Sequence, residues 1–202
     1  MKKSFILLSA IILSSVVFEG CFKKGPDDPF ISLHSRKARL VGDWTISAGS
    51  GKTANGTTIT TWSYANPTLT STSGSTTTTQ TVTYKTSYKK DGTWTSESTT
   101  TGTLFGQTYK DVKTEFGTWE FAGGVGSVKK KTQLVAATLS SVEVQTVGTT
   151  TTTTTNTYSG QESVSVFTID ELKNKTIIVK WDNSSTSGST TSSDSGQYTL
   201  TQ

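Results

Sequence analysis

Residues 81–88 read Thr-Val-Thr-Tyr-Lys-Thr-Ser-Tyr, and this stretch decides the fold class because apolar and polar side chains alternate along it. In an extended chain Val82, Tyr84 and Tyr88 point to one face, while Thr83, Lys85 and Ser87 point to the other. An antiparallel strand with one face in the core and one in water has this pattern. The stretch therefore predicts a half-buried β-strand.

The dipeptide Asp91-Gly92 follows this strand closely, and Trp94 comes just after it. Glycine adopts a positive φ at little steric cost, so the dipeptide predicts a tight hairpin turn with a returning strand behind it. The same period-two pattern recurs along the chain and predicts eight or nine strands. They cover residues 40–46, 58–70, 81–88, 93–104, 117–121, 129–147, 162–169, 176–182 and 196–201.

Two threonine tracts, residues 76–79 and 149–155, contain no apolar side chain. Such tracts are typical of disordered linkers, since nothing in them offsets the entropy lost on ordering. Threonine nevertheless favours strands, and each tract adjoins a period-two segment. We expect the tracts to form the ends of hairpins.

The only helical pattern after the N-terminal segment is short and lies over residues 30–39. Consecutive hairpins without a long crossover helix leave two all-β architectures, an up-and-down antiparallel barrel and a sandwich. The amino-acid composition is similar throughout residues 30–202, which favours a single domain.

The barrel is favoured by the segment Leu40-Val41-Gly42-Asp43-Trp44, which follows the short helix. This Gly-x-Trp segment resembles the start of lipocalins and of the lipocalin-like domains of Bacteroidetes lipoproteins. The segments at 91–94, 117–121 and 169–181 are similar in order to that pattern. The resemblance implies a lipocalin-like barrel in which the helix closes one end and Trp44 packs against it.

The N-terminus has the order of a secretory signal: Lys2 and Lys3, an apolar run over residues 5–18, and then Glu19-Gly20-Cys21. The run of 14 residues is shorter than the roughly 18 of a membrane-spanning helix. Cys21 is the only cysteine, so it has no partner for an intrachain disulfide. The alternatives to a cleaved lipoprotein signal are cleavage nearby by signal peptidase I, which leaves a free thiol, and a permanent transmembrane helix.

Gly20 and Cys21 resemble the end of the signal of bacterial lipoproteins, which are cut before a lipid-modified cysteine. The resemblance implies a signal over residues 1–20, a lipid on Cys21 and an outer-membrane location in the cell envelope. The Gly- and Pro-containing residues 21–29 have no apolar period and predict a flexible tether. The membrane, reached through the lipid, is the expected partner.

Charge and composition argue against several functions. Removal of residues 1–20 takes away Lys2, Lys3 and Glu19, which leaves 17 basic and 14 acidic residues, too balanced for nucleic-acid binding. His34 is the only histidine, and no cysteine beyond the lipidation candidate Cys21 is present to complete a zinc site. The pairs Asp27-Asp28 and Asp170-Glu171 favour solvated or turn-capping roles. We expect no enzyme, no metal and no cofactor.

Aromatic residues supply the remaining candidates for a site. Those on the less polar strand faces point into a barrel, where they either fill the core or line a ligand cavity. We expect a non-enzymatic envelope protein that binds a small apolar ligand or serves as a structural module. The alternative is a surface module that contacts a glycan or protein through Thr- and Ser-rich loops, with Trp62 or Tyr64 as contacts. The candidate ligand residues are Trp44, Tyr84, Tyr88, Trp94, Trp119 and Trp181.

Overall fold

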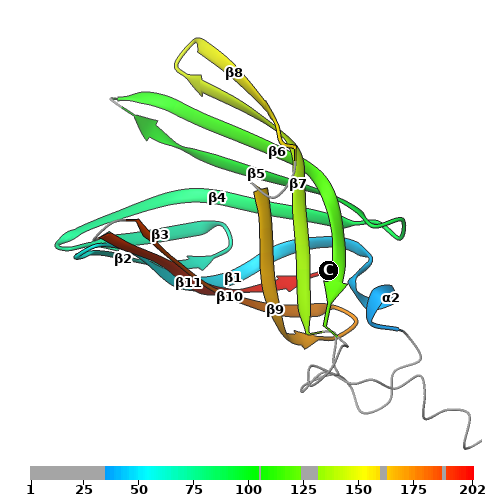
Figure 1. The fold of residues 1–202 in the computed structure, drawn as a ribbon. Helices are drawn as coiled ribbons and strands as arrows, with labels where there is room; N and C mark the ends of the chain where they lie inside the picture. The colour runs from blue at the N-terminus through cyan, green and yellow to red at the C-terminus, as the bar shows by residue number, and fades with distance from the viewer. Residues whose placement is uncertain (1–34, 105, 124–131, 160–162, 188–189) are drawn as a thin grey trace, which may run out of the picture.

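The computed structural model describes residues 35–104, 106–123, 132–159, 163–187 and 190–202 (Figure 1). The signal, Cys21, the tether, His34, the Gly-rich residues 124–126 and the lysines 129–131 lie outside the described residues. The described elements are one short helix and eleven strands: α2 (Arg36–Leu40), β1 (Gly42–Asn55), β2 (Thr58–Ala65), β3 (Thr68–Ser73), β4 (Thr76–Tyr88), β5 (Thr93–Leu104), β6 (Gln107–Ala122), β7 (Gln133–Val147), β8 (Thr150–Thr157), β9 (Val164–Leu172), β10 (Thr176–Ser187) and β11 (Thr190–Thr201).

The strands form an antiparallel barrel that closes through ten strands, with β8 outside it. Pairing follows chain order from β1 to β7, skips to β9, and continues through β10 and β11 back to β1. The all-β class and the lipocalin-like antiparallel barrel are therefore confirmed. The sandwich alternative is excluded by the closing pairs between β1 and β11 and between β6 and β7.

The circumference of the barrel changes along its axis. Near α2, residues Gly42–Thr45 of β1 pair directly with Lys85–Tyr88 of β4, so the ring there passes through eight strands. Farther along, β1 and β4 separate and the hairpin of β2 and β3 is inserted between them. The Asn66-Pro67 turn occupies the fork, since Asn66 N–H donates to Ser47 O and Val82 N–H donates to Pro67 O.

The other end of the barrel is splayed, as Figure 1 shows. Strand β9 pairs with the first part of β7, whereas the second part of β7, from Ser140 onward, pairs with β8. The described pairing of β9 with β10 covers Thr168–Leu172 of β9. Strand β10 pairs with β11 along its whole length, so beyond Lys180 its described partner is β11 alone. The hairpin of β7 and β8 thus points away from the hairpin of β10 and β11.

Two-residue turns connect most of the hairpins. Gly56, Gly74 and Gly148 have positive φ angles of 58° to 59° and occupy the turns after β1, β3 and β7, as tight hairpins require. The first tract begins β4, and the second forms the turn residue Thr149 and the first part of β8, which confirms the hairpin prediction. In three hairpins, two threonines that face each other across the strands form a hydrogen bond between their hydroxyls, at the second residue pair from the turn. These pairs are Thr72–Thr77, Thr146–Thr151 and Thr186–Thr191.

The core fills the eight-stranded end and is covered by α2. Ser35 caps the helix by accepting a hydrogen bond from Ala38 N–H, and Leu40 at the helix end is completely buried. Arg39, 6% exposed, donates a hydrogen bond to the carbonyl of Leu172 on β9. The helix is therefore tied to the barrel by both burial and a charged hydrogen bond.

Two features of the strand prediction were wrong. The structure has eleven strands rather than eight or nine, and residues 58–70 form two strands, β2 and β3. The Asn66-Pro67 turn divides them, because proline cannot donate to a strand ladder and asparagine favours turns. The helix begins at Arg36 within the described residues. Strand β9 continues through Asp170 and Glu171 to Leu172, beyond the predicted strand end at residue 169.

Candidate functional site

A cavity of about 310 Å³ lies inside the barrel, beyond the filled end. Side chains from α2 and from all eight strands of the narrower ring surround it, and Ser163 before β9 also lines it. Its apolar wall consists of Leu40, Ile46, Leu134, Ile177, Val179 and Leu200. This volume is at the lower end of the range of about 300 to 1,000 Å³ that small-molecule pockets occupy.

Three of the predicted aromatic residues line this cavity: Tyr84, Tyr88 and Trp94. Tyr88 and Trp94 are cross-strand partners on β4 and β5, and both are nearly buried. Burial raises the pKa of Tyr88 to about 12, and a hydrogen bond with Thr86 opposes this change. Burial also raises the pKa of Tyr84, so both phenols are neutral at physiological pH.

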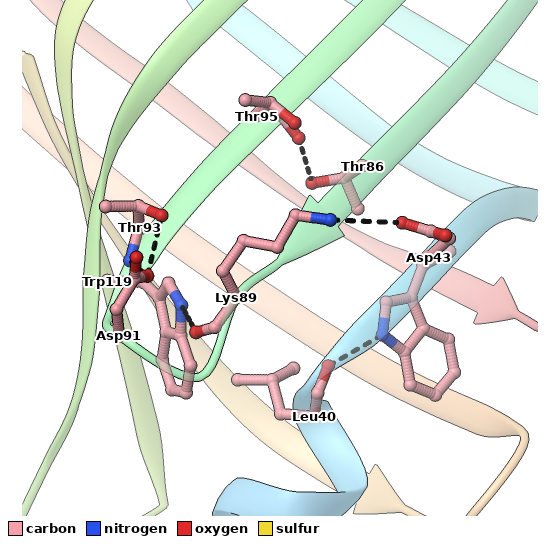
Figure 2. Close-up of polar contacts among 9 residues, drawn as sticks. Leu40, Asp43, Thr86, Lys89, Asp91, Thr93, Thr95 and Trp119 are labelled. Carbon is pink, nitrogen blue, oxygen red and sulfur yellow. Dashed lines mark hydrogen bonds and ion pairs between the residues drawn. The ribbon is translucent and has the colours of Figure 1, made fainter.

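Trp44 and Trp119 are not among the residues that line the cavity, because they belong to the closed end. Trp44 Nε1–H donates to Leu40 O at 2.8 Å, which joins β1 to α2, and Trp119 Nε1–H donates to Lys89 O at 3.1 Å (Figure 2). Lys37 of the helix lies 5.6 Å from the Trp119 ring centroid. These contacts agree with the packing that the lipocalin resemblance implied for Trp44.

The turn beside Trp119 is also fixed by polar contacts (Figure 2). Asp91 Oδ1 accepts hydrogen bonds from the N–H and the hydroxyl of Thr93. These bonds, the backbone bond first, lower the pKa of Asp91. Gly92 has a φ of 92°, and its carbonyl accepts from Trp119 N–H of β6 at 2.7 Å. The pairing of β4 with β5 on the two sides of this turn confirms the predicted hairpin.

Trp181 lies in a second aromatic cluster that adjoins the cavity. Its ring centroid is 4.8 Å from that of Tyr198 and 6.2 Å from that of Phe167, and both of these residues line the cavity. Trp62 stacks on Trp181 with 5.9 Å between centroids and 11° between ring planes. Burial, and then the neighbouring groups Tyr84 and Asp194, raise the pKa of Tyr198.

One side of the cavity is polar. Thr86, Ser96, Glu115, Thr138, Ser163 and Ser165 line it there. Lys113 Nζ lies 2.8 Å from Glu115 Oε1. Partial burial alone lowers the pKa of Lys113, but the hydrogen bond and charge of Glu115 outweigh this and raise it. The cavity therefore has the Glu115 carboxylate and several hydroxyl groups on one side, and aliphatic and aromatic side chains on the others.

Sequence reasoning missed Phe167, Tyr198 and Glu115 as cavity residues. Tyr198 is two residues from Leu200 on β11 and Phe167 is two from Ile169 on β9, so the period-two pattern that identified the other strands contained the signal. Glu115 carries the same signal, because it is two residues from Gly117 and four from Trp119 on β6, and the bulge beside Gly117 adds Leu139 to β7 rather than a residue to β6.

The carboxylates that the sequence singled out in the barrel make ion pairs on the surface. Asp170 Oδ2 lies 2.8 Å from Lys180 Nζ, and Glu171 Oε2 lies 2.6 Å from Lys173 Nζ. Over the described ranges, no group of three or more His, Cys, Asp or Glu side chains is arranged to hold a metal ion. In the same part of the chain, no helix has the length and apolar character needed to span a bilayer.

Comparisons with protein-family models, curated proteins and solved structures find no match to this chain.

Proposed function

We propose that this protein is a lipid-anchored lipoprotein of the bacterial cell envelope that holds a small, largely apolar ligand inside its barrel. The observation that supports the proposal is the internal cavity of about 310 Å³ with hydrocarbon walls. An eight-stranded ring leaves room for side chains or for one small ligand. Here the buried core leaves this space open, and core residues such as Leu40, Leu134 and Ile177 form part of its wall.

The polar wall indicates the kind of apolar ligand. Glu115 and Ser96 would accept or donate hydrogen bonds to one polar group, while Leu134, Ile177 and Val179 would contact a hydrocarbon body. A chain alcohol has this chemistry. We therefore propose an amphiphile with one hydroxyl group as the ligand class, carried without any chemical conversion.

The anchor is the second part of the proposal. Lipid on Cys21 would hold the barrel at the outer membrane, since each buried methylene contributes about 0.8 kcal/mol and two or three acyl chains suffice. Residues 22–29 would then act as the tether. Acyl labelling of cells tests this directly: the native protein should incorporate labelled fatty acid and the Cys21→Ser variant should not.

Thermal unfolding with decan-1-ol tests the cavity. The full-length Cys21→Ser chain is suited to it because it lacks the acylation site. A ligand at a hundred times its Kd stabilises a protein by about 2.7 kcal/mol. For a chain of this length that raises the Tm by roughly 5 to 10 °C.

The matched variants are Ala136→Phe and Ala137→Phe. Ala136 lines the cavity, whereas the neighbouring Ala137 is not among the lining residues and points to the opposite face of β7. Ala136→Phe should fill the cavity and abolish the decanol shift, while Ala137→Phe should retain it. An unchanged Tm with decanol in the unsubstituted chain, or an equal shift in both variants, would contradict the proposed cavity function.

A further inference from the structure

The second aromatic cluster is built on a regular row of four residues that crosses four neighbouring strands. Trp62 on β2 pairs with Gly51 on β1, Gly51 pairs with Gly196 on β11, and Gly196 pairs with Trp181 on β10. Directly paired residues point to the same face of a sheet. The row therefore reads Trp, Gly, Gly, Trp on one face, and we call it the Trp row.

The two glycines provide the space in which the indole rings lie. A Cβ on Gly51 would be 2.6 Å from Trp62 Cζ2, and a Cβ on Gly196 would be 2.7 Å from Trp181 Cζ2. Each ring thus lies across the glycine paired with it, in contact with the bare backbone. As a result the rings are close to parallel, with 11° between their planes.

Hydrogen bonds hold Trp181 in this position. Its Nε1–H donates to Asp194 Oδ2 at 2.8 Å, and Asp194 Oδ1 accepts from the Thr53 hydroxyl at 3.3 Å. Tyr198 supports both indoles, with ring centroids 5.4 Å from Trp62 and 4.8 Å from Trp181. Trp62 and Trp181 remain only partly buried. A rigid aromatic surface of this kind loses little entropy on binding.

The rows on the two sides of the Trp row differ in polarity. On the side toward the cavity the paired residues are Tyr64, Gly49, Tyr198 and Val179. On the other side they are Thr60, Thr53, Asp194 and Asn183, all polar. The Trp row is therefore bordered along one side by hydroxyl, carboxylate and amide groups.

We infer that the Trp row is a carbohydrate-binding surface that takes the pyranose rings of a neutral glycan. One face of a pyranose carries C–H groups of slight positive charge, which the negative face of an indole attracts. The hydroxyls at the sugar's edge need acceptors and donors. Asp194 has two lone-pair sites left beyond its two hydrogen bonds, and Asn183 offers an amide.

This inference concerns a site separate from the proposed cavity function. A purely apolar ligand would leave the Thr53, Asp194 and Asn183 border without a role. The Trp row also does not line the cavity, although Tyr198 lies beside both.

Isothermal titration calorimetry of the full-length Cys21→Ser chain with neutral hexasaccharides tests the inference. The probes are maltohexaose, cellohexaose, xylohexaose, mannohexaose and chitohexaose. At least one should bind with a millimolar or tighter Kd. Trp62→Ala and Trp181→Ala should each weaken that binding tenfold or more, and Trp62→Phe, which keeps an aromatic face, should weaken it less than Trp62→Ala.

Two controls separate binding from folding and from the cavity. Phe116→Ala removes an aromatic side chain that is 43% exposed on β6, away from the Trp row, and should leave the sugar Kd unchanged. Ala136→Phe should block decanol but not the sugar. The inference is overturned if none of the five hexasaccharides gives heat of binding, or if the tryptophan variants retain wild-type affinity.

Discussion

Gly117 on β6 has no room for a side chain, and this makes a sharp prediction about stability. A Cβ at this position would lie 2.0 Å from the carbonyl oxygen of Ala137 on β7 and 2.7 Å from Trp94 Nε1. Real Cβ contacts are essentially absent below 3.0 Å, so the backbone of β7 would have to move by at least 1.0 Å. We predict that Gly117→Ala destabilises the barrel.

The size of the effect follows from what surrounds Gly117. Overpacking costs about 1 to 3 kcal/mol and sometimes more. The upper value applies here, because the obstacle is backbone in the closing pair of the barrel rather than a flexible side chain. For a chain of this length, a loss of about 3 kcal/mol lowers the Tm by roughly 6 to 12 °C.

Gly102 on β5 is the matched control. A Cβ there meets nothing within 4 Å, and its φ is not in the left-handed region. Since glycine inside a strand is less stable than alanine by roughly 0.5 to 1 kcal/mol, Gly102→Ala should raise the Tm slightly. Thermal unfolding followed by circular dichroism measures both variants. If Gly117→Ala melts within about 2 °C of Gly102→Ala, where the two effects above require a far larger gap, the steric reasoning is refuted.

Three further predictions concern the closed end and its turn. Trp44→Phe removes the buried hydrogen bond to Leu40 O and should cost about 1 to 3 kcal/mol in urea unfolding; an unchanged midpoint would contradict this. The folded-state pKa of Asp91 is depressed, so its stabilisation should be present at neutral pH and lost on acidification below its ordinary pKa of 3.8. The stability gap between wild type and Asp91→Ala should therefore close at low pH, and a constant gap would count against it. The pKa of Tyr88 is raised from 10.0 to about 12, so the unfolded state ionises first and stability should fall as pH rises between these values; Tyr88→Phe should lose less over that interval, and equal losses would argue otherwise.

The period-two pattern was sufficient to predict the fold class, because alternation reports which residues share a face. It also placed Tyr84, Tyr88 and Trp94 inside the barrel, where they line the cavity. The pattern carries no information about depth along the barrel axis. Trp44 therefore has the same alternation as Tyr84, yet it lies against α2 at the closed end.

The Trp row depends on pairing between segments distant in the chain. Gly51 and Gly196 are 145 positions apart, and nothing local to either one indicates that the two glycines face each other. The division of residues 58–70 was present in the sequence as Asn66-Pro67, a known turn signal. Glu115 shares the alternation of Gly117 and Trp119 on β6, but it precedes the predicted strand 117–121, and a carboxylate is not a residue that a pattern of buried side chains selects.

The fork between β1 and β4 means that the two ends of this molecule need not evolve together. Lengthening or trimming the β2–β3 insertion would alter the aperture while the hydrogen bonds of Gly42–Thr45 with Lys85–Tyr88 keep the base shut. A single scaffold of this design can thus be given openings of different width by editing one hairpin.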